Sequence, residues 1–239
     1  MHASDTGPSP LRAPAARLSI RRVPVRRALG WLAAGWADCR RTPAPLAVAS
    51  IVLLILAVFA SRVASWLPIL LLPPYLGTVA AYLRMADRGQ VFLSGSGAWR
   101  SARLWSVGIG LLLLGAVLNG GLALFVLSTL GPAIRTSMPV VGAVVALIFL
   151  VRLLVVPVLA ICWLAPALVV NRDAGVLQAL RLSMAGSWRN AGAFLGTALA
   201  AAVLLMLATV PLGLGLVVAL PVLACAAVRA ADEIVVDAA

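Results

Sequence analysis

The sequence predicts an all-α membrane protein, a polytopic bundle of about six transmembrane helices. Of its 239 residues 63% are hydrophobic and 11% are charged, and the mean hydropathy is +1.10. This composition leaves too little polar surface to cover a water-soluble globule. Apolar runs long enough to cross a bilayer recur along the chain. Finally, the arginines are concentrated in every second connection between these runs, as expected for cytoplasmic loops.

The net charge of +12 is carried entirely by arginine, because the chain contains no lysine. These arginines flank apolar runs and form no separate polar domain, so we expect them to set the topology and to attract anionic lipid headgroups. A nucleic-acid reader would need a water-facing basic surface, and we expect no nucleic-acid partner. The only histidine is His2, and the three cysteines have no metal-binding spacing. No metal, cofactor or catalytic residue is therefore predicted.

The N-terminal part divides into a tail and an amphipathic helix. Residues 1–24 are rich in Pro, Ser, Ala and Arg, which predicts a disordered cytoplasmic tail. Residues 25–41 place one apolar stripe at helical spacing, formed by Val25, Leu29, Leu32, Trp36 and Cys39. A helix of this kind lies in the headgroup region of a membrane, and a basic flank that holds the N-terminus inside is a compatible alternative.

A first hairpin of spans is predicted at 45–60 and 63–83, interrupted at Ser61-Arg62. The second of these spans contains three prolines, and we expect it to be kinked or broken at Pro68, Pro73 and Pro74. It ends in Arg84 and Asp87, which are three residues apart and are expected to pair on one helix face.

The central part of the chain contains two spans, 104–130 and 139–170, and one polar residue in each. Asn119 could pack by a hydrogen bond to a neighbouring helix or could line a substrate path. An intramembrane arginine such as Arg152 is by default a functional-site hypothesis, and snorkelling to an interface is its structural alternative. The run 139–170 is longer than one crossing needs, so it is either one tilted helix or a re-entrant piece followed by a span.

The C-terminal part repeats the pattern of the N-terminal part. A second surface helix is predicted at 174–190, with spans at 192–210 and 212–228 and a short tail at 236–239. The last span ends with another Arg-x-x-Asp pair, Arg229 and Asp232. The predicted membrane domain as a whole covers residues 25–235.

The arginine distribution predicts that both termini are cytoplasmic. With six spans, sixteen arginines lie on the same side of the membrane as the N-terminus, and only Arg62 and Arg135 lie on the other side. The two hairpins also resemble each other, because each follows a Trp- and Arg-containing helix, includes a proline and ends in Arg-x-x-Asp. Both run in the same direction, which indicates a parallel internal repeat with its axis along the membrane normal.

Four motifs resemble those of a family of uncharacterised bacterial inner-membrane proteins. The chain carries G-W-A-D-C-R-R-T-P at 35–43, R-M-A-D-R-G at 84–89, L-A-P-A-L-V at 164–169 and S-W-R-N at 187–190. The family is similar to the membrane domains associated with glycerophosphodiester phosphodiesterases. It has an asparagine where this chain has Thr42 and an aromatic residue at Leu164. The resemblance implies the six-helix architecture and the location, and it implies no activity.

These observations favour a non-catalytic bundle that scaffolds, assembles or binds lipids and proteins through its cytoplasmic face. We expect anionic lipids as partners, together with other membrane proteins or further copies of the chain. The candidate contact surface consists of Arg26, Arg27, Trp36, Arg40, Arg41, Arg181, Trp188 and Arg189. The alternative is a small transporter or channel for an anionic or amphipathic solute. An enzyme is not expected, because no convergent acid, base or nucleophile occurs, although a lipid-modifying activity is a further alternative.

Overall fold

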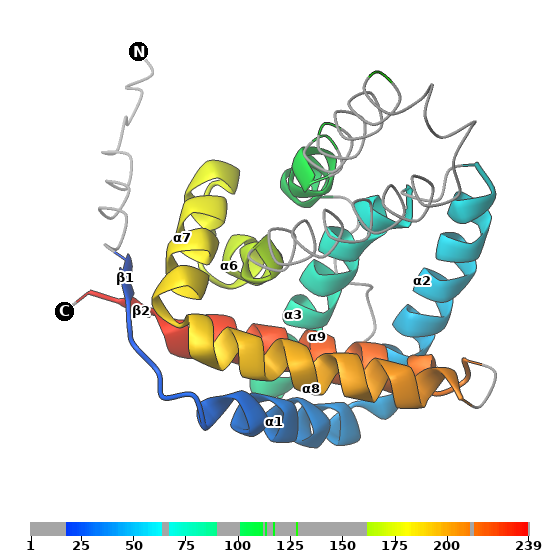
Figure 1. Cartoon of the computed structure of the whole chain (residues 1–239), viewed down its shortest axis with the longest axis horizontal. Coiled ribbons are helices and arrows are strands. Elements are labelled where there is room, and N and C mark those ends of the chain that lie inside the picture. Colours follow the sequence, from blue (N-terminus) through cyan, green and yellow to red (C-terminus); the bar gives the residue numbers. More distant parts are fainter. Residues whose placement is uncertain are drawn as a thin grey trace, which may run out of the picture.

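The computed structural model is mostly helical, as the all-α prediction requires (Figure 1). It describes residues 18–63, 67–89, 101–111, 162–210 and 213–238, with residues 113, 117 and 128 standing alone. The predictions for Asn119, Arg135 and Arg152, and most of the spans 104–130 and 139–170, lie outside these residues. The elements in chain order are β1 (Leu18–Ile20), α1 (Arg27–Arg41), α2 (Pro43–Val63), the 3-10 helix η1 (Leu67–Leu71), α3 (Leu72–Asp87), the 3-10 helix η3 (Cys162–Leu164), α6 (Ala165–Asn171), α7 (Val176–Arg189), α8 (Ala191–Thr209), α9 (Leu216–Ile234) and β2 (Val235–Asp237).

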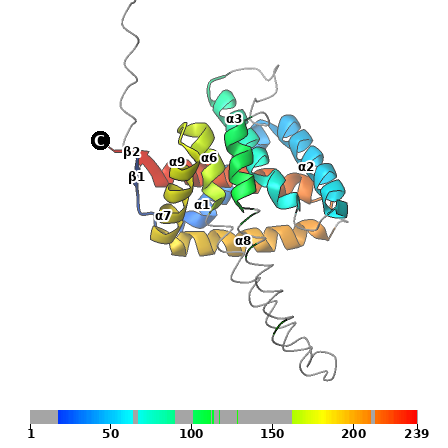
Figure 2. The ribbon, with the colours of Figure 1, turned by 90° about the horizontal axis from the view of Figure 1, so that it is seen from above.

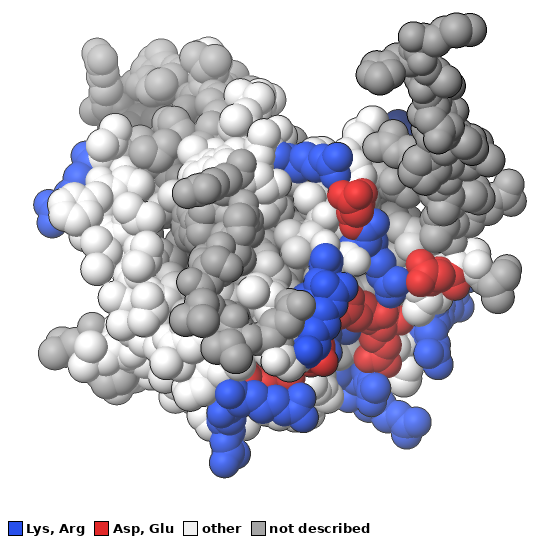
Figure 3. Space-filling model, turned by 180° about the vertical axis from the view of Figure 1, so that it is seen from behind, with Lys and Arg blue, Asp and Glu red and all other residues white. Residues whose placement is uncertain are grey.

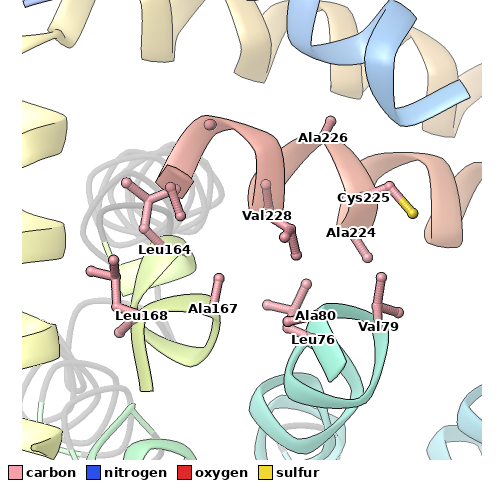
Figure 4. Packing of buried hydrophobic residues seen from close by; sticks show 14 of the residues in the cluster. Leu76, Val79, Ala80, Leu164, Ala167, Leu168, Ala224, Cys225, Ala226 and Val228 are labelled. Atoms are coloured by element: carbon pink, nitrogen blue, oxygen red, sulfur yellow. The ribbon is translucent and has the colours of Figure 1, made fainter. Parts of the chain in front are cut away.

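Helix α9 is the centre of the described fold, and it contacts α1, α2, α3, α6 and α8. Its small side chains face neighbouring helices, and Figure 4 shows Ala224 and Val228 opposite Val79 and Ala80 of α3. Alanines and valines let helix axes approach closely while they still fill the space between them. Viewed from above, α7 and α2 stand at opposite ends of α8 (Figure 2).

Helices α1 and α9 approach each other closely at Gly35. The two helices run antiparallel, because Trp31 near the start of α1 bonds to Glu233 near the end of α9. A Cβ atom added at Gly35 would lie 2.5 Å from the carbonyl oxygen of Val222 and 2.8 Å from the amide nitrogen of Ala226. Only glycine allows the two backbones this contact, so Gly35 fixes the distance between α1 and α9.

Two pairs of helices are separated by a single non-helical residue. Thr42 separates α1 from α2, and it precedes Pro43, which disfavours helical geometry at the residue before it. Asn190 separates α7 from α8. Its side-chain amide donates to the carbonyl oxygens of Gly186 (2.9 Å) and Arg21 (3.1 Å), and its Oδ1 accepts from the amide of Val23 (2.7 Å). The asparagine therefore holds the N-terminal segment against this helix junction.

The two ends of the described part pair with each other, which corrects the predicted tails 1–24 and 236–239 at residues 18–20 and 236–237; residues 1–17 and 239 lie outside the described residues. Strand β1 runs antiparallel to β2, with Ile20 opposite Val235 and Leu18 opposite Asp237. The amide of Arg21 continues the ladder to the carbonyl oxygen of Ile234 at 2.8 Å. Polar composition indicated disorder, but Leu18 and Ile20 alternate with Ser19 and pack against the core, which gives this segment enough apolar burial to be ordered.

The first hairpin also differs from its predicted bounds. Helix α2 continues through Ser61 and Arg62 to Val63, so the predicted interruption at this point is wrong. The Ser61 hydroxyl donates to the carbonyl oxygen of Val58 (2.7 Å), a bond that a helix accommodates. The prolines act further along: η1 contains Pro68, and α3 has Pro73 and Pro74 in its first turn, where a proline removes no helical hydrogen bond.

Helices α2 and α8 are the two described helices long and apolar enough to cross a membrane. Only 17% of the most apolar window of α2 and 22% of that of α8 is buried within the protein. Large side chains such as Phe59 (69% exposed) and Met206 (65% exposed) cover their outer faces. The core helix of a soluble protein would bury such residues.

Helix α1 buries a face that only partly coincides with its predicted apolar stripe. The buried residues are Ala28, Trp31, Gly35, Asp38 and Cys39, so Cys39 of the stripe is buried, whereas Val25, Leu29 and Trp36 are exposed. The helix therefore packs Trp31 and several small residues inside the protein and leaves most of the stripe exposed.

Helix α7 shows the same division. It buries Ala179, Ser183, Gly186 and Ser187 against its neighbours. The apolar stripe that the sequence predicts for this helix consists of Val176, Leu177, Leu180, Met184 and Trp188. Leu177, Met184 and Trp188 of this stripe are exposed, Trp188 by 80%. Close helix packing selects small residues, so the larger apolar residues of α1 and α7 remain available to a lipid or protein partner.

Candidate functional site

On the face drawn in Figure 3, most of the charged side chains gather toward the lower right, whereas much of the rest of this face is uncharged. The region lies where α3 and α6 end beside the last turns of α9. We call it the arginine cluster. Its members are Asp38, Arg84, Asp87, Arg88, Asn171, Arg172, Arg229 and Asp232.

Arg229 is the best-compensated cation of the arginine cluster. Its Nε donates to Oδ2 of Asp38 at 2.6 Å and its Nη2 donates to Oδ1 at 3.0 Å, so one carboxylate binds two donors on one edge of the guanidinium. A weaker contact runs from Nη1 to Oδ2 of Asp87 at 3.4 Å. The hydrogen bonds to Asp38 raise the pKa of Arg229, while burial acts in the opposite direction. Bidentate geometry of this kind is the strongest form of the arginine–carboxylate pair.

Arg84 occupies a comparable position on α3 but meets an amide instead of a carboxylate. Its Nη2 donates to Oδ1 of Asn171 at 3.1 Å, and among the described residues it forms no ion pair within 4.0 Å. Nδ2 of Asn171 in turn donates to Oδ1 of Asp232, also at 3.1 Å. Burial and then the charge of Arg88 lower the pKa of Arg84, and Asp232 offsets this only in part. The guanidinium of Arg84 is thus positioned by a neutral group.

This arrangement corrects the two ion pairs predicted within helices. The described structure contains no ion pair between Arg84 and Asp87 or between Arg229 and Asp232, although each pair is three residues apart. Arg229 reaches Asp87 on the neighbouring helix, and Arg84 reaches Asp232 through Asn171. A spacing of three residues makes a pair possible, but partners on packed helices give shorter contacts and less competition from water.

A cavity of about 190 Å³ opens between these helices. Four arginines and two aspartates are among its lining residues, so the lining carries a formal excess of two positive charges: Arg84, Arg88, Arg172 and Arg229 against Asp87 and Asp232. Arg172 is paired outside the cavity lining, with Asp237 at 2.8 Å. Asp87 accepts from Arg229, and Asp232 accepts from Asn171. Arg88 is exposed, and its guanidinium has no hydrogen-bonding or ionic partner among the described residues.

A second polar contact fixes the start of α1 to the end of α9. Glu233 accepts hydrogen bonds from Nε1 of Trp31 at 2.8 Å and from Nε of Arg27 at 2.7 Å. This contact was not predicted, and neither were the roles of Asp38 and Asn171. In the sequence Asn171 is followed by Arg172 and Asp173, and Glu233 follows Asp232. A buried polar side chain needs a hydrogen-bonding partner, but the sequence does not say which one.

The predicted lipid or partner surface remains exposed in the structure. Arg26, Arg40, Arg41, Arg181 and Arg189 are all exposed, as is Arg27 despite its contact with Glu233. The guanidinium of Arg40 lies over the Trp36 ring at 5.7 Å from its centroid. An arginine above an indole is a pair suited to the boundary between headgroups and hydrocarbon.

The described residues contain no group of His, Cys, Asp and Glu that could hold a metal ion. Cys39 and Cys225 are free and buried. The carboxylates of the arginine cluster accept hydrogen bonds from Arg or Asn, so their chemistry here is electrostatic. The arrangement is suited to holding an anion against Arg84 and Arg88.

The fold defines an all-α protein with two helices long and apolar enough to cross a membrane. No family model, curated protein or solved structure matches the chain.

Proposed function

We propose that the chain is a multi-pass protein of a bacterial inner membrane, with about six spans and both termini in the cytoplasm. Its function is that of a non-catalytic bundle that binds lipids or other membrane proteins through its cytoplasmic face. The observation that carries this proposal is the exposed apolar surface of α2 and α8. In water such a surface costs about 25 cal/mol for every Å², and contiguous patches of it mark membrane or partner contacts.

An apolar groove between α1, α8 and α9 supports contact with lipid. It has a volume of about 590 Å³ and is lined almost entirely by aliphatic side chains. Trp36 belongs to the lining, and Arg40 covers the ring of Trp36. A lipid chain in the groove would therefore lie beside the guanidinium of Arg40 at the edge of the groove, as at a bilayer interface.

The arginine distribution supports the number and direction of the spans. Removing or adding one span would distribute the sixteen cytoplasmic arginines over both sides of the membrane. The parallel repeat is supported by the common order of α1, α2 and α3 and of α7, α8 and α9, each with a one-residue break after its first helix. The same features agree with the resemblance to bacterial inner-membrane proteins. No observation on the described residues favours transport or catalysis.

Cysteine labelling of the full chain in intact cells tests the topology. The three native cysteines are first replaced by alanine, and Arg62→Cys and Asp237→Cys are then introduced separately. A membrane-impermeant maleimide should label the variant at position 62 in intact cells, because this residue is expected outside. It should label the variant at position 237 only after permeabilisation. Equal labelling of both variants in intact cells would refute the proposed topology.

A further inference from the structure

We propose that the cavity of the arginine cluster binds a phosphate group, with Arg84 and Arg88 as its principal ligands. The shared chemistry is the anionic oxygens of a phosphate group, which either inorganic phosphate or the phosphodiester headgroup of a lipid can supply. The cavity lies on the proposed cytoplasmic face, and phosphate would be its specific ligand. For the lipid source the proposal rests on the proposed function, because the headgroup must lie at the level of this cavity.

The first support is the uncompensated charge of Arg84. Arg229 has the carboxylate of Asp38 at 2.6 Å, whereas Arg84 has only the amide oxygen of Asn171 at 3.1 Å. Both guanidinium groups are partly buried at the same group of helix ends. An arginine that is held in place by a neutral acceptor keeps its charge and most of its N–H donors for another anion.

The second support is the position of Arg88. It directly follows the last residue of α3, four residues after Arg84, and both side chains line the cavity. Like charges at this spacing repel each other, and the lowered pKa of Arg84 reflects that repulsion in addition to burial. A bound anion between the two guanidinium groups would replace repulsion by two charge-assisted contacts.

The third support is that both carboxylates in the cavity lining already accept hydrogen bonds from other residues. Asp87 accepts a hydrogen bond from Arg229, and Asp232 accepts one from Asn171. Neither carboxylate lies within ion-pair distance of Arg84 or Arg88 in the described structure. The cavity of about 190 Å³ corresponds to roughly six water molecules at ~30 Å³ each. It can therefore hold a phosphate group together with some of its hydration water.

Binding is measured by isothermal titration calorimetry on the full chain in a zwitterionic detergent without phosphate groups. The two probes are inorganic phosphate and a short-chain phosphatidylglycerol, each at constant ionic strength. We expect Arg88→Gln and Arg84→Gln to weaken binding by about tenfold or more, the usual effect of losing a charge-assisted contact. Arg62→Gln removes the same charge at the end of α2, outside the cavity lining, and should leave binding unchanged.

A charge-neutral exchange sharpens the test. The double variant Asn171→Asp/Asp232→Asn gives Arg84 a carboxylate partner while the formal charge of the cavity lining stays the same. If the free charge of Arg84 carries binding, this variant should bind phosphate about tenfold more weakly. Undiminished binding in the double variant would overturn the role of Arg84. Thermal unfolding of each variant verifies that it is folded, and Arg88→Gln provides the decisive result if substitution of Arg84 prevents folding.

The two probes distinguish the sources of the phosphate group. Binding of inorganic phosphate that depends on Arg84 and Arg88 shows a site for a free anion. Binding of phosphatidylglycerol alone with the same dependence shows a lipid site. If neither probe binds, or if Arg62→Gln weakens binding as much as Arg88→Gln does, the proposal fails. Cysteine labelling at position 62 is independent of this result, so failure of the phosphate site and failure of the membrane topology are distinguishable.

Discussion

Helices α3 and α9 end in the same Arg-x-x-Asp sequence, but the two arginines meet different chemical groups. Arg229 of α9 faces the buried carboxylate of Asp38 from α1, and Arg84 of α3 faces the amide of Asn171 from α6. One arginine is neutralised within the fold, whereas the other retains its charge beside a cavity. The comparison shows that the same local motif can have two outcomes. The helix packed against it determines whether its arginine has a carboxylate partner or remains available to bind another anion.

The largest expected effect comes from removing the carboxylate that neutralises Arg229. Asp38→Asn keeps the shape of the side chain but leaves the partly buried guanidinium of Arg229 with only the weaker ion pair to Asp87 at 3.4 Å. We expect the free energy of unfolding to fall by about 3 kcal/mol, the lower end of the cost of breaking a buried ion pair. Urea or thermal unfolding in detergent measures the change.

A matched control for this variant is Asp173→Asn. Its partner Arg103 lies at 2.6 Å, but both side chains are largely exposed, so the loss should stay below about 1 kcal/mol. Equal losses for Asp38→Asn and Asp173→Asn would contradict the difference between a buried and an exposed pair.

The contact between α1 and α9 can be broken without touching a charge. Gly35→Ala places a methyl group 2.5 Å from the carbonyl oxygen of Val222, so the helices must separate. A loss of about 2 kcal/mol is expected from such overpacking. Gly30 lies on the same helix, and a Cβ there would meet nothing closer than 3.6 Å. Gly30→Ala should therefore be neutral or stabilising by up to about 1 kcal/mol, and a destabilisation as large as that of Gly35→Ala would contradict the assigned packing.

The antiparallel alignment of α1 and α9 also depends on the contact of Trp31 with Glu233. Trp31→Phe retains an aromatic ring but removes the indole N–H that donates at 2.8 Å. Loss of one partly buried hydrogen bond to a charged acceptor should cost about 1.5 kcal/mol. Trp36→Phe serves as the control, because the Trp36 ring is partly exposed and contacts Arg40 at the surface. If thermal unfolding shows no difference between the two variants, the role assigned to Trp31 is wrong.

The smallest expected effect comes from giving Arg84 a carboxylate partner, as Arg229 has. In Asn171→Asp/Asp232→Asn, Arg84 gains an ion pair and the hydrogen bond between positions 171 and 232 can be kept. The gain in the free energy of unfolding should be only about 0.5 kcal/mol, because this region is partly exposed. A decrease measured by thermal unfolding would show that Asn171 has a structural role beyond its contact with Arg84.

Much of the fold could be predicted from composition and periodicity, and the errors have a common cause. Helices near 25–41, 174–190 and 192–210 were expected, since their apolar residues recur at helical spacing or continuously. The predicted apolar faces of α1 and α7 were partly wrong, because the face that packs is built from small residues with little hydrophobic signal, such as Gly35 and Gly186. The predicted break at Ser61-Arg62 overestimated how strongly polar residues interrupt a helix.

The candidate site was predicted only as isolated parts. Arg84, Asp87, Arg229 and Asp232 were identified, but they were paired within their own helices. Asp38 and Asn171, which decide the chemistry of the two arginines, were missed. Asp38 is 191 residues from Arg229 and Asn171 is 87 residues from Arg84, and neither spacing has a signature in a single sequence.

The sequence by itself predicted an all-α fold with helices apolar enough to cross a membrane, because apolar burial and periodicity depend on composition and order alone. It also placed the ends of α1, α7 and α8 within two residues of their observed bounds. Only the tertiary structure decided which arginine is neutralised and which remains free. That outcome depends on which helix ends meet in space, because a hydrogen-bonded ion pair needs its donor and acceptor in direct contact.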